Sequence, residues 1–256
     1  MLNKLLETAG KAYLLKEHAA GAYSRLKIRG IRFDIHSFTA EGLGHVSAMS
    51  AKGFFGLMQM DTFIITPFHV DMPLLSYDRM RMAGKDIMLL EMVDTMLERA
   101  DLSPLAELKR SAADLPDYTP KPAWYEYLDL PENIYKQGNK AHRKAFDQTA
   151  ESFVKAYLAC AANANPCDAE PKREKSSVYV EGLLSKGGVS TDLFVKGLGR
   201  EKTAHIFRSI LFGTGAPENN KGAAKYDQNP LRLPRQYLPV ADGGVYYEGN
   251  GEKGAA

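Results

Sequence analysis

The chain of 256 residues carries 33 Lys and Arg against 31 Asp and Glu, a formal net charge of +2. Hydrophobic residues make up 45% and charged residues 25%, a globular composition that excludes a disordered or collagen-like chain. The balanced charge argues against nucleic acid as a partner. No apolar run approaches the ~20 residues of a membrane helix, and the first residues lack the apolar core of a signal peptide. We therefore expect a cytoplasmic protein without a membrane partner.

Several familiar chemistries have no signature in the sequence. Cys160 and Cys167 are the two cysteines, and they form no CxxC motif. The six histidines show neither HxxxH nor HExxH spacing, so we expect neither a disulfide framework nor a metal site. GxxxxGK[ST] and GxSxG are also absent, and GxGxxG occurs only in the Gly-rich end of the chain, at residues 249–254, which argues against a nucleotide cradle and a serine nucleophile. We expect no tightly bound cofactor.

The hydrophobic pattern changes from helical to extended along the first third of the chain. Apolar residues at helical spacing predict an amphipathic helix over about the first twenty residues. Ile31, Phe33 and Ile35 then alternate with polar residues, which is the period of a half-buried strand. Further extended runs cover roughly residues 45–51, 54–66, 74–82 and 86–94. Because the separators are too short for crossover helices, residues 31–95 are predicted to form an antiparallel meander.

Helical spacing returns at Ser103. We expect helices from Ser103, over residues 145–157, and near 175–184, 190–196 and 200–212, packed on the sheet. A Pro-rich segment with the single tryptophan, residues 120–124, is expected as a surface loop. From about residue 216 the composition shifts to Gly, Asn, Pro and Lys, which predicts an extended or partly disordered tail over 216–256. Residues 1–215 are predicted to form one domain. The fold class is therefore α+β, with helices flanking a central antiparallel sheet.

Methionine is concentrated in the predicted strands. Nine of the ten methionines lie between Met49 and Met96. The flexible, polarisable thioether suits a surface that moulds around a large apolar ligand. A methionine-filled core explains the same clustering, and composition alone favours it.

Four acidic residues interrupt these mainly apolar strands: Asp61, Asp78, Glu91 and Asp94. Side chains two residues apart share a face, so Asp78 points the same way as Ser76 and Met80. A carboxyl desolvated there would have a raised pKa and would suit a general acid. The alternative is a structural Asp paired with an Arg or a backbone amide. Glu91 and Asp94 lie on opposite faces of their strand, so at most one can join a common cluster.

Two histidines lie near these acids. His45 opens a strand, and His69 lies in the loop before Pro73. A histidine near carboxylates can shuttle protons. An exposed histidine without a role is the alternative for His69.

Two segments resemble a known family. The sequence DMPLLSYD (residues 71–78), preceded by a Thr66-Pro67 strand end, resembles the D/G-x-P-[IL]-[FL]-[GS]-x-D strand of the ferredoxin-dependent bilin reductases. Leu183-Leu184 with residues 194–202 and 207–213 resembles the closing pattern of that family. The resemblance spans roughly residues 25–213. It implies an α/β/α sandwich that reduces a linear tetrapyrrole such as biliverdin with single electrons from a ferredoxin, without a metal or organic cofactor.

The resemblance also implies roles for particular residues. Asp78 falls on the essential aspartate of the family, in agreement with the argument from its face of the strand. The strand histidine of the family falls near Asp61 or Thr62, and His45 matches another histidine with a larger gap. Some members carry an aspartate before the closing helices. This sequence has a Gly-Gly pair at the corresponding position, and the nearest acidic residue is Asp192. The second proton donor is therefore left open.

The candidate site combines both lines of reasoning. The catalytic candidates are Asp78, Asp61 and His45, and the substrate-binding candidates are Thr62, Met60, Met80, His69, Arg81 and Asp192. Arg81 is expected at a rim, where a cation would hold a ligand propionate. Residues 171–256 hold 13 Lys and Arg against 9 Asp and Glu, which favours docking of an acidic electron carrier there.

Other functions fit parts of the same pattern. The related red chlorophyll catabolite reductases would share the radical chemistry. A non-catalytic tetrapyrrole or heme carrier would keep the pocket and explain the missing second acid. A structural protein with a methionine-rich core would leave the buried carboxylates as an unexplained cost.

Overall fold

An eight-stranded antiparallel sheet forms the centre of the computed structural model, which describes residues 1–215. The strand order is β1-β3-β4-β5-β6-β7-β8, and β2 pairs with the first part of β3. The strands are β1 (Leu15–His18), β2 (Arg25–Ile28), β3 (Ile31–Ala40), β4 (Gly44–Gly53), β5 (Met58–Pro67), β6 (Leu74–Met82), β7 (Lys85–Val93) and β8 (Ile134–Gly138). Strands β3 to β7 are neighbours in chain order, so the predicted meander is confirmed.

The register of the strands assigns each side chain to a face. Directly opposed residues share a face, and one row across β4 to β8 consists of Met49, Thr62, Asp78, Leu89 and Tyr135. The side of the sheet that carries this row is called the Asp78 face. The opposite side carries Asp61 and Arg79, which oppose each other on β5 and β6, and is called the Asp61 face.

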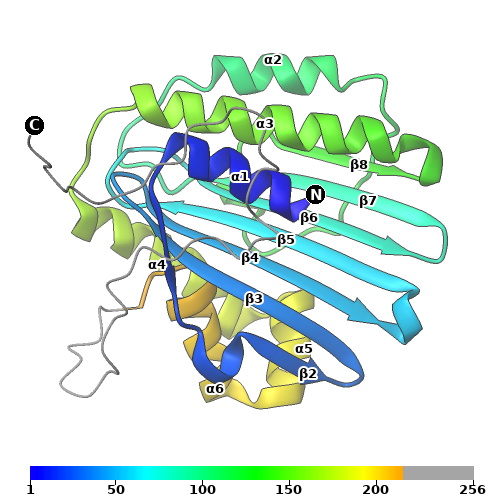
Figure 1. Ribbon diagram of the computed structural model, residues 1–256. Coiled ribbons are helices and arrows are strands. Elements are labelled where there is room, and N and C mark those ends of the chain that lie inside the picture. The colour runs from blue at the N-terminus through cyan, green and yellow to red at the C-terminus, as the bar shows by residue number, and fades with distance from the viewer. Residues whose placement is uncertain (216–256) are drawn as a thin grey trace, which may run out of the picture.

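Helices cover both faces (Figure 1). The Asp61 face packs against α1 (Leu2–Ala12), α2 (Ser103–Ser111) and α3 (Arg143–Asn163). The Asp78 face packs against α4 (Ala169–Lys186), α5 (Val189–Leu198), α6 (Arg200–His205) and the π-helical turn η5 (Ile206–Leu211). Four short 3-10 turns are η1 (Gly21–Tyr23), η2 (Phe54–Gly56), η3 (Glu126–Leu128) and η4 (Lys140–His142). The expected α+β sandwich is confirmed.

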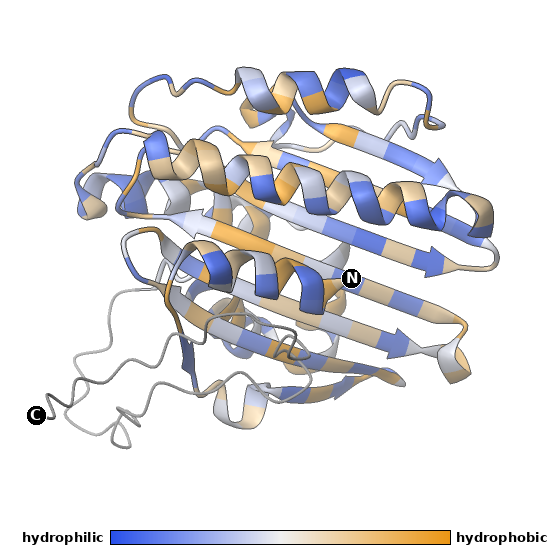
Figure 2. Ribbon diagram, turned by 45° about the horizontal axis from the view of Figure 1, so that its top comes forward, coloured by the Kyte–Doolittle hydropathy of each residue, from blue (hydrophilic) through white to orange (hydrophobic). Residues whose placement is uncertain are grey.

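Each helical layer buries its own hydrophobic core against the sheet. Phe63, Tyr77 and Phe146 of α3 belong to the core on the Asp61 face, whereas Phe33 packs against Phe194 of α5 on the Asp78 face. Figure 2 shows the resulting bands of hydrophobic and hydrophilic residues along the strands. Each such buried side chain contributes roughly 1.5–3 kcal/mol relative to an exposed one.

Some elements differ from the sequence prediction. The first helix ends at Ala12, and the residues after it form β1, which pairs with the end of β3. Strands β2 and β8 are also additional to the predicted meander. All three are short, and they are extended because they pair with a neighbouring strand. The tail predicted for residues 216–256 lies outside the described residues.

Candidate functional site

Asp78 lies in the middle of β6, held by two hydroxyl groups. Thr62 on β5 donates a hydrogen bond to Asp78 Oδ1 at 2.5 Å, and Ser76 donates to Oδ2 at 3.0 Å. The β5–β6 register places Thr62 directly opposite Asp78, and the two-residue strand period places Ser76 on the same face. Burial raises the pKa of Asp78, and the two hydrogen bonds oppose that rise because they favour the carboxylate.

Glu91 on β7 is the second carboxyl at this position. It lies opposite Ser76, which is the hydroxyl that contacts Asp78. Burial, together with the negative charges of Asp78 and Asp129, raises the pKa of Glu91 to about 8. Two acids on adjacent strands therefore share an environment that keeps a proton near neutral pH.

The surface around these carboxyls is apolar and accessible. The side chains of Met60, Met80, Ile87, Leu89 and Tyr135 are all partly exposed on this part of the Asp78 face. Their neighbours on the other side of the same strands, such as Met88 and Leu90, are fully buried. The covering helices pack on the other half of the sheet, where η5 contacts β3 and β4. An accessible apolar surface with two proton-holding carboxyls is thus left over β5 to β8.

Aromatic side chains line the boundary between this surface and α4. The ring centroids of Trp124 and Tyr125 are 5.3 Å apart, and those of Tyr125 and Tyr179 are also 5.3 Å apart. The Trp124 indole packs on α4 at Gly182, where an added Cβ would lie 1.9 Å from the ring. The Pro-rich segment expected as a surface loop therefore presses its tryptophan against α4.

Asp61 and Arg81 lie on the Asp61 face. Arg81 Nη2 is 3.0 Å from Asp61 Oδ2, and the pair lies on the side of the sheet opposite Asp78. Alternation along β5 turns Asp61 away from the face to which its neighbour Thr62 points. The grouping of Asp61 with Asp78 and the placement of Arg81 at the same site are therefore wrong.

His45 shares the face of Asp78 but lies at another place on it. Its Nε2 is 2.9 Å from the carbonyl oxygen of Ile210, and Ser47 donates to the carbonyl of Leu211 at 2.7 Å. Burial lowers the pKa of His45 to about 4, so the ring is neutral at physiological pH. His45 is two strands and four residues from Asp78, which corresponds to about 17 Å. It anchors η5, and its grouping with Asp78 is wrong.

The other candidates are divided between the site and the surface. Thr62, Met60 and Met80 lie beside Asp78, as expected. His69 is exposed in the loop at the far end of β6. Asp192 is exposed in the first turn of α5. Sequence reasoning missed Tyr135 and Asp129, which border Glu91, because neither β8 nor the bridge between Val93 and Asp129 was predicted.

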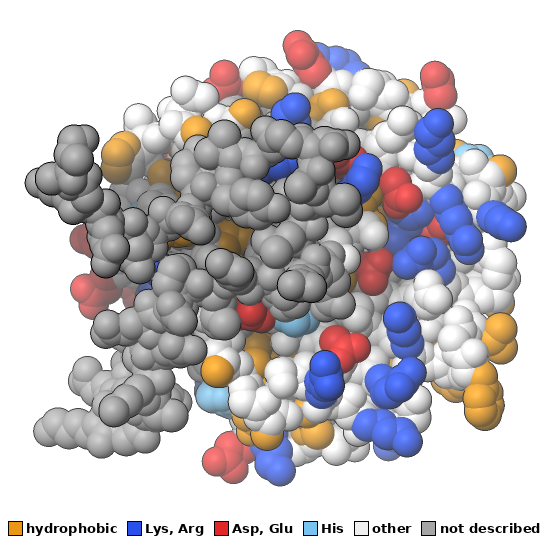
Figure 3. All heavy atoms as spheres, in the orientation of Figure 1, with side chains coloured by type: hydrophobic (Ala, Val, Ile, Leu, Met, Phe, Trp, Pro, Cys, Tyr) orange, Lys and Arg blue, Asp and Glu red, His pale blue; other side chains and the backbone are white. Residues whose placement is uncertain are grey.

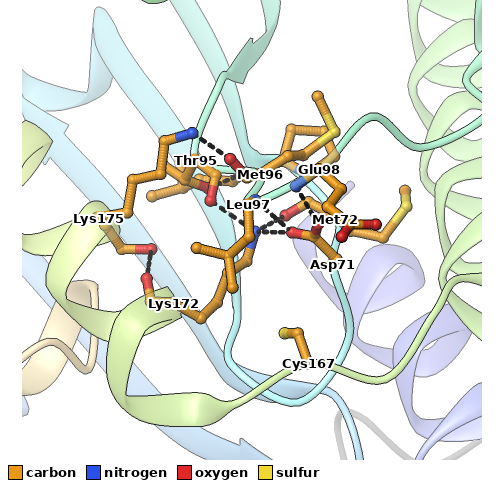
Figure 4. Close-up of polar contacts among 12 residues, drawn as sticks. Asp71, Met72, Thr95, Met96, Leu97, Glu98, Cys167, Lys172 and Lys175 are labelled. Atoms are coloured by element: carbon orange, nitrogen blue, oxygen red, sulfur yellow. Dashed lines mark hydrogen bonds and ion pairs between the residues drawn. The ribbon is translucent and has the colours of Figure 1, made fainter.

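Asp71, the first residue of the DMPLLSYD segment, has a structural role (Figure 4). Its carboxylate accepts hydrogen bonds from the amides of Leu97 and Glu98 at 2.8 and 2.6 Å. Fully buried Lys172 of α4 donates to Asp71 at 3.0 Å and to the carbonyls of Met72 and Thr95 at 2.7 and 2.6 Å. This cluster fastens α4 to the segments that flank β6 and β7.

Two further searches cover residues 1–215. Within that range no helix is long and apolar enough to cross a membrane. No group of His, Cys, Asp and Glu side chains in the described part of the chain is arranged to hold a metal ion.

Comparison with known proteins gives a structural match. Neither a family model nor a curated protein sequence matches the chain. Among solved structures, phytochromobilin synthase from tomato in complex with biliverdin is similar, with a TM-score of 0.69 and 16% identity. The match covers 82% of this chain and 80% of that one. The chain therefore shares the fold of this phytochromobilin synthase.

Proposed function

We propose that the protein reduces a linear tetrapyrrole of the biliverdin type on the Asp78 face. The observation that supports this proposal most directly is that the carboxyls of Asp78 and Glu91, both with raised pKa, lie on an accessible apolar surface. The solved neighbour of the same fold was crystallised with biliverdin. Perturbed carboxyls in an apolar setting are typical of acid–base sites.

The chemistry needs electrons and protons in equal number. Reduction of one double bond takes two electrons and two protons. A carrier such as ferredoxin delivers its electrons singly, so the ligand passes through a radical anion that is more basic than the starting tetrapyrrole. Asp78 protonates that radical, and Met60 and Met80 contact the conjugated plane. The scheme requires no metal or tightly bound cofactor.

A basic region suits an acidic electron carrier. Figure 3 shows Lys and Arg side chains gathered over the hairpin end of the sheet. The exposed members there are Arg25, Lys27, Arg29, Arg32, Lys52, Lys85, Lys140, Arg143 and Lys144. Asp78 is four residues from Met82 at this end, about 13 Å along the strand. We assign carrier docking to this cluster, whereas the sequence favoured residues 171–256, of which 216–256 lie outside the described residues.

An apolar tip projects from the same end. Phe54 and Phe55 of η2 are 59% and 110% exposed, and both have positive φ, at 51° and 56°. Exposed aromatic residues held in strained backbone are typical of interaction sites. We assign this tip, with the basic cluster, to carrier docking. Phe54→Ser/Phe55→Ser should raise the KM for the carrier and leave biliverdin affinity unchanged, whereas an unchanged KM removes the tip from the docking site.

The experiment that tests the function has two stages. Biliverdin is titrated into the purified protein and the visible spectrum is recorded, and reduced ferredoxin is then added under anaerobic conditions. The proposal expects binding at about one equivalent, followed by loss of the biliverdin band, with turnover that falls as salt rises. Binding without reduction would instead indicate a tetrapyrrole carrier, and absence of binding would reject the bilin function.

A further inference from the structure

Glu91 lies where a second proton donor is needed. Reduction takes two protons, and Asp78 carries one. Asp61 and Arg81 are on the other face, His45 is neutral and bonded to η5, and Asp192 is exposed. Glu91 is on the strand next to Asp78, and Ser76 lies between the two carboxyls in the register.

Tyr135 on β8 connects Glu91 to a third acid. It lies opposite Leu89, diagonal to Glu91 on the same face. Asn133 donates from Nδ2 to the Tyr135 hydroxyl oxygen at 2.9 Å, and Asn133 Oδ1 is itself held by the amide of Met92 at 2.6 Å. Because Asn133 occupies the oxygen as a donor, the single hydroxyl hydrogen of Tyr135 is free to point to a carboxyl. Tyr135 lies close enough to Glu91 and Asp129 to lower the pKa of each carboxyl.

Asp129 brings this chain of groups toward the surface. It lies in the loop that bridges to Val93 at the end of β7, three residues after exposed Glu126. Its Oδ1 is buried and has no hydrogen-bond partner. Asp129 as a whole is partly exposed, so its carboxyl can exchange protons with solvent.

Every titratable group that faces Glu91 is acidic or phenolic. These groups are Asp78 on β6, Tyr135 on β8, Asp129 and Tyr125 in the loop, and Tyr179 on α4. None of the ion pairs among residues 1–215 includes Asp78, Glu91 or Asp129. Without a cation, a cluster of this kind lowers its electrostatic energy by holding protons.

We propose that Glu91 is the second proton donor of the Asp78 site and is reloaded through Tyr135 and Asp129. The inference rests on the proposed function. Two electrons from the carrier and one proton each from Asp78 and Glu91 convert one double bond into two new bonds to hydrogen. Both donors are left as carboxylates, and solvent protons restore them, with Glu91 reloaded along the Asp129–Tyr135 path.

Single-turnover and multiple-turnover reduction of biliverdin by Glu91→Gln and Tyr135→Phe test this assignment. Glu98→Gln, an exposed Glu outside the site, is the matched control. Glu91→Gln should bind biliverdin with unchanged affinity and lose about 10²- to 10⁴-fold in rate, stalling at a species different from that of Asp78→Asn. Tyr135→Phe should complete the first turnover normally and slow from the second onward. The wild-type rate should fall at alkaline pH as the two donors lose their protons, and the part of this fall that comes from Glu91 should be absent from Glu91→Gln.

Three outcomes would overturn all or part of the inference. If Glu91→Gln gives product at the wild-type rate with the wild-type pH profile, Glu91 is not a donor, while the proposed function stands. If Glu91→Gln is slow but Tyr135→Phe matches the control in every turnover, the reloading path is rejected. A wild-type protein that neither binds nor reduces biliverdin rejects both proposals. Thermal melts of each variant separate these results from misfolding.

Discussion

Buried acidic side chains have different partners on the two faces of the sheet. On the Asp61 face, Asp86 is 1% exposed and accepts hydrogen bonds from Nε and Nη2 of Arg79, which is 2% exposed. Asp61 pairs with Arg81 on the same face. On the Asp78 face, Asp78 and Glu91 have hydroxyl neighbours and no cation among the described residues.

The contrast separates structural charges from chemical ones. A buried carboxylate with a bidentate Arg stays ionised and fixes the packing of its neighbours. A carboxyl without a cation pays for burial in stability and retains its proton. Such an arrangement persists when the site needs the proton, so the Asp78 face is where we place the reaction.

Replacement of Asp78 should have the largest functional effect. Asp78→Asn keeps the size and most hydrogen bonds of the side chain but cannot release a proton. We expect unchanged biliverdin affinity and a rate loss on the order of 10²- to 10⁴-fold. Single-turnover spectra with reduced ferredoxin measure this loss, and a thermal melt checks the fold. Normal product formation would remove Asp78 from the role of donor.

On the Asp61 face the largest effect should be on stability. Arg79→Met leaves buried Asp86 with only Arg143, whose Nε is 3.6 Å away, which should cost about 3–5 kcal/mol in the free energy of unfolding. Urea denaturation measures the change, with exposed Arg110→Met as the control. Arg79→Met/Asp86→Leu should recover most of the loss. A single variant as stable as the control would contradict the structural role of the pair.

Lys172 provides a second structural cation for comparison. Lys172→Met removes three hydrogen bonds but leaves the two backbone amides that bind Asp71. We expect a loss of about 3 kcal/mol, at the lower end of the range for a broken buried pair. Exposed Lys155→Met is the control in the same denaturation series. Equal stability of the two variants would mean that α4 does not depend on this cluster.

The raised pKa of Glu91 gives stability a pH dependence of known sign. Between the ordinary pKa of 4.5 and about 8, the folded protein holds a proton at Glu91 that the unfolded chain has released. Stability should therefore fall as pH rises through this window, by about 1 kcal/mol per pH unit from this group. Glu91→Gln should remove that slope in urea denaturation at several pH values. Parallel pH profiles of the variant and the wild type would refute the raised pKa.

The smallest effect is expected at Asp61. Asp61→Asn breaks a partly exposed ion pair with Arg81, so the stability loss should stay below about 1 kcal/mol. Biliverdin affinity and turnover should equal those of the wild type because Asp61 lies on the other face. Loss of turnover with unchanged binding would place chemistry on the Asp61 face and contradict the comparison.

Sequence predicted the direction of Asp78 but not its partners. The two-residue period of β6 is local, so the face shared with Ser76 and Met80 followed directly from the pattern. The contact with Thr62 depends on the β5–β6 register, and the proximity of Glu91 depends on the pairing of β7. His45 failed as a candidate because a shared face does not imply a short distance across several strands.

The missed elements have a similar cause. The five residues of β8, Ile134–Gly138, have a mixed composition and become a strand because they pair with β7, more than forty residues earlier in the chain. A pattern within one segment cannot reveal such a pairing. Tyr135 and Asn133 were therefore beyond the reach of local periodicity.

The protonation state of the two carboxyls tests the account most directly. Infrared difference spectra of the ligand-free protein at about pH 7 report the carbonyl stretch of protonated carboxylic acids. We expect this band in the wild type and in Asp61→Asn, a strong reduction in Glu91→Gln, and an altered band in Asp78→Asn because the two acids interact. A wild-type spectrum without the band, or one that neither Glu91→Gln nor Asp78→Asn changes, would contradict the claim that the Asp78 face stores protons.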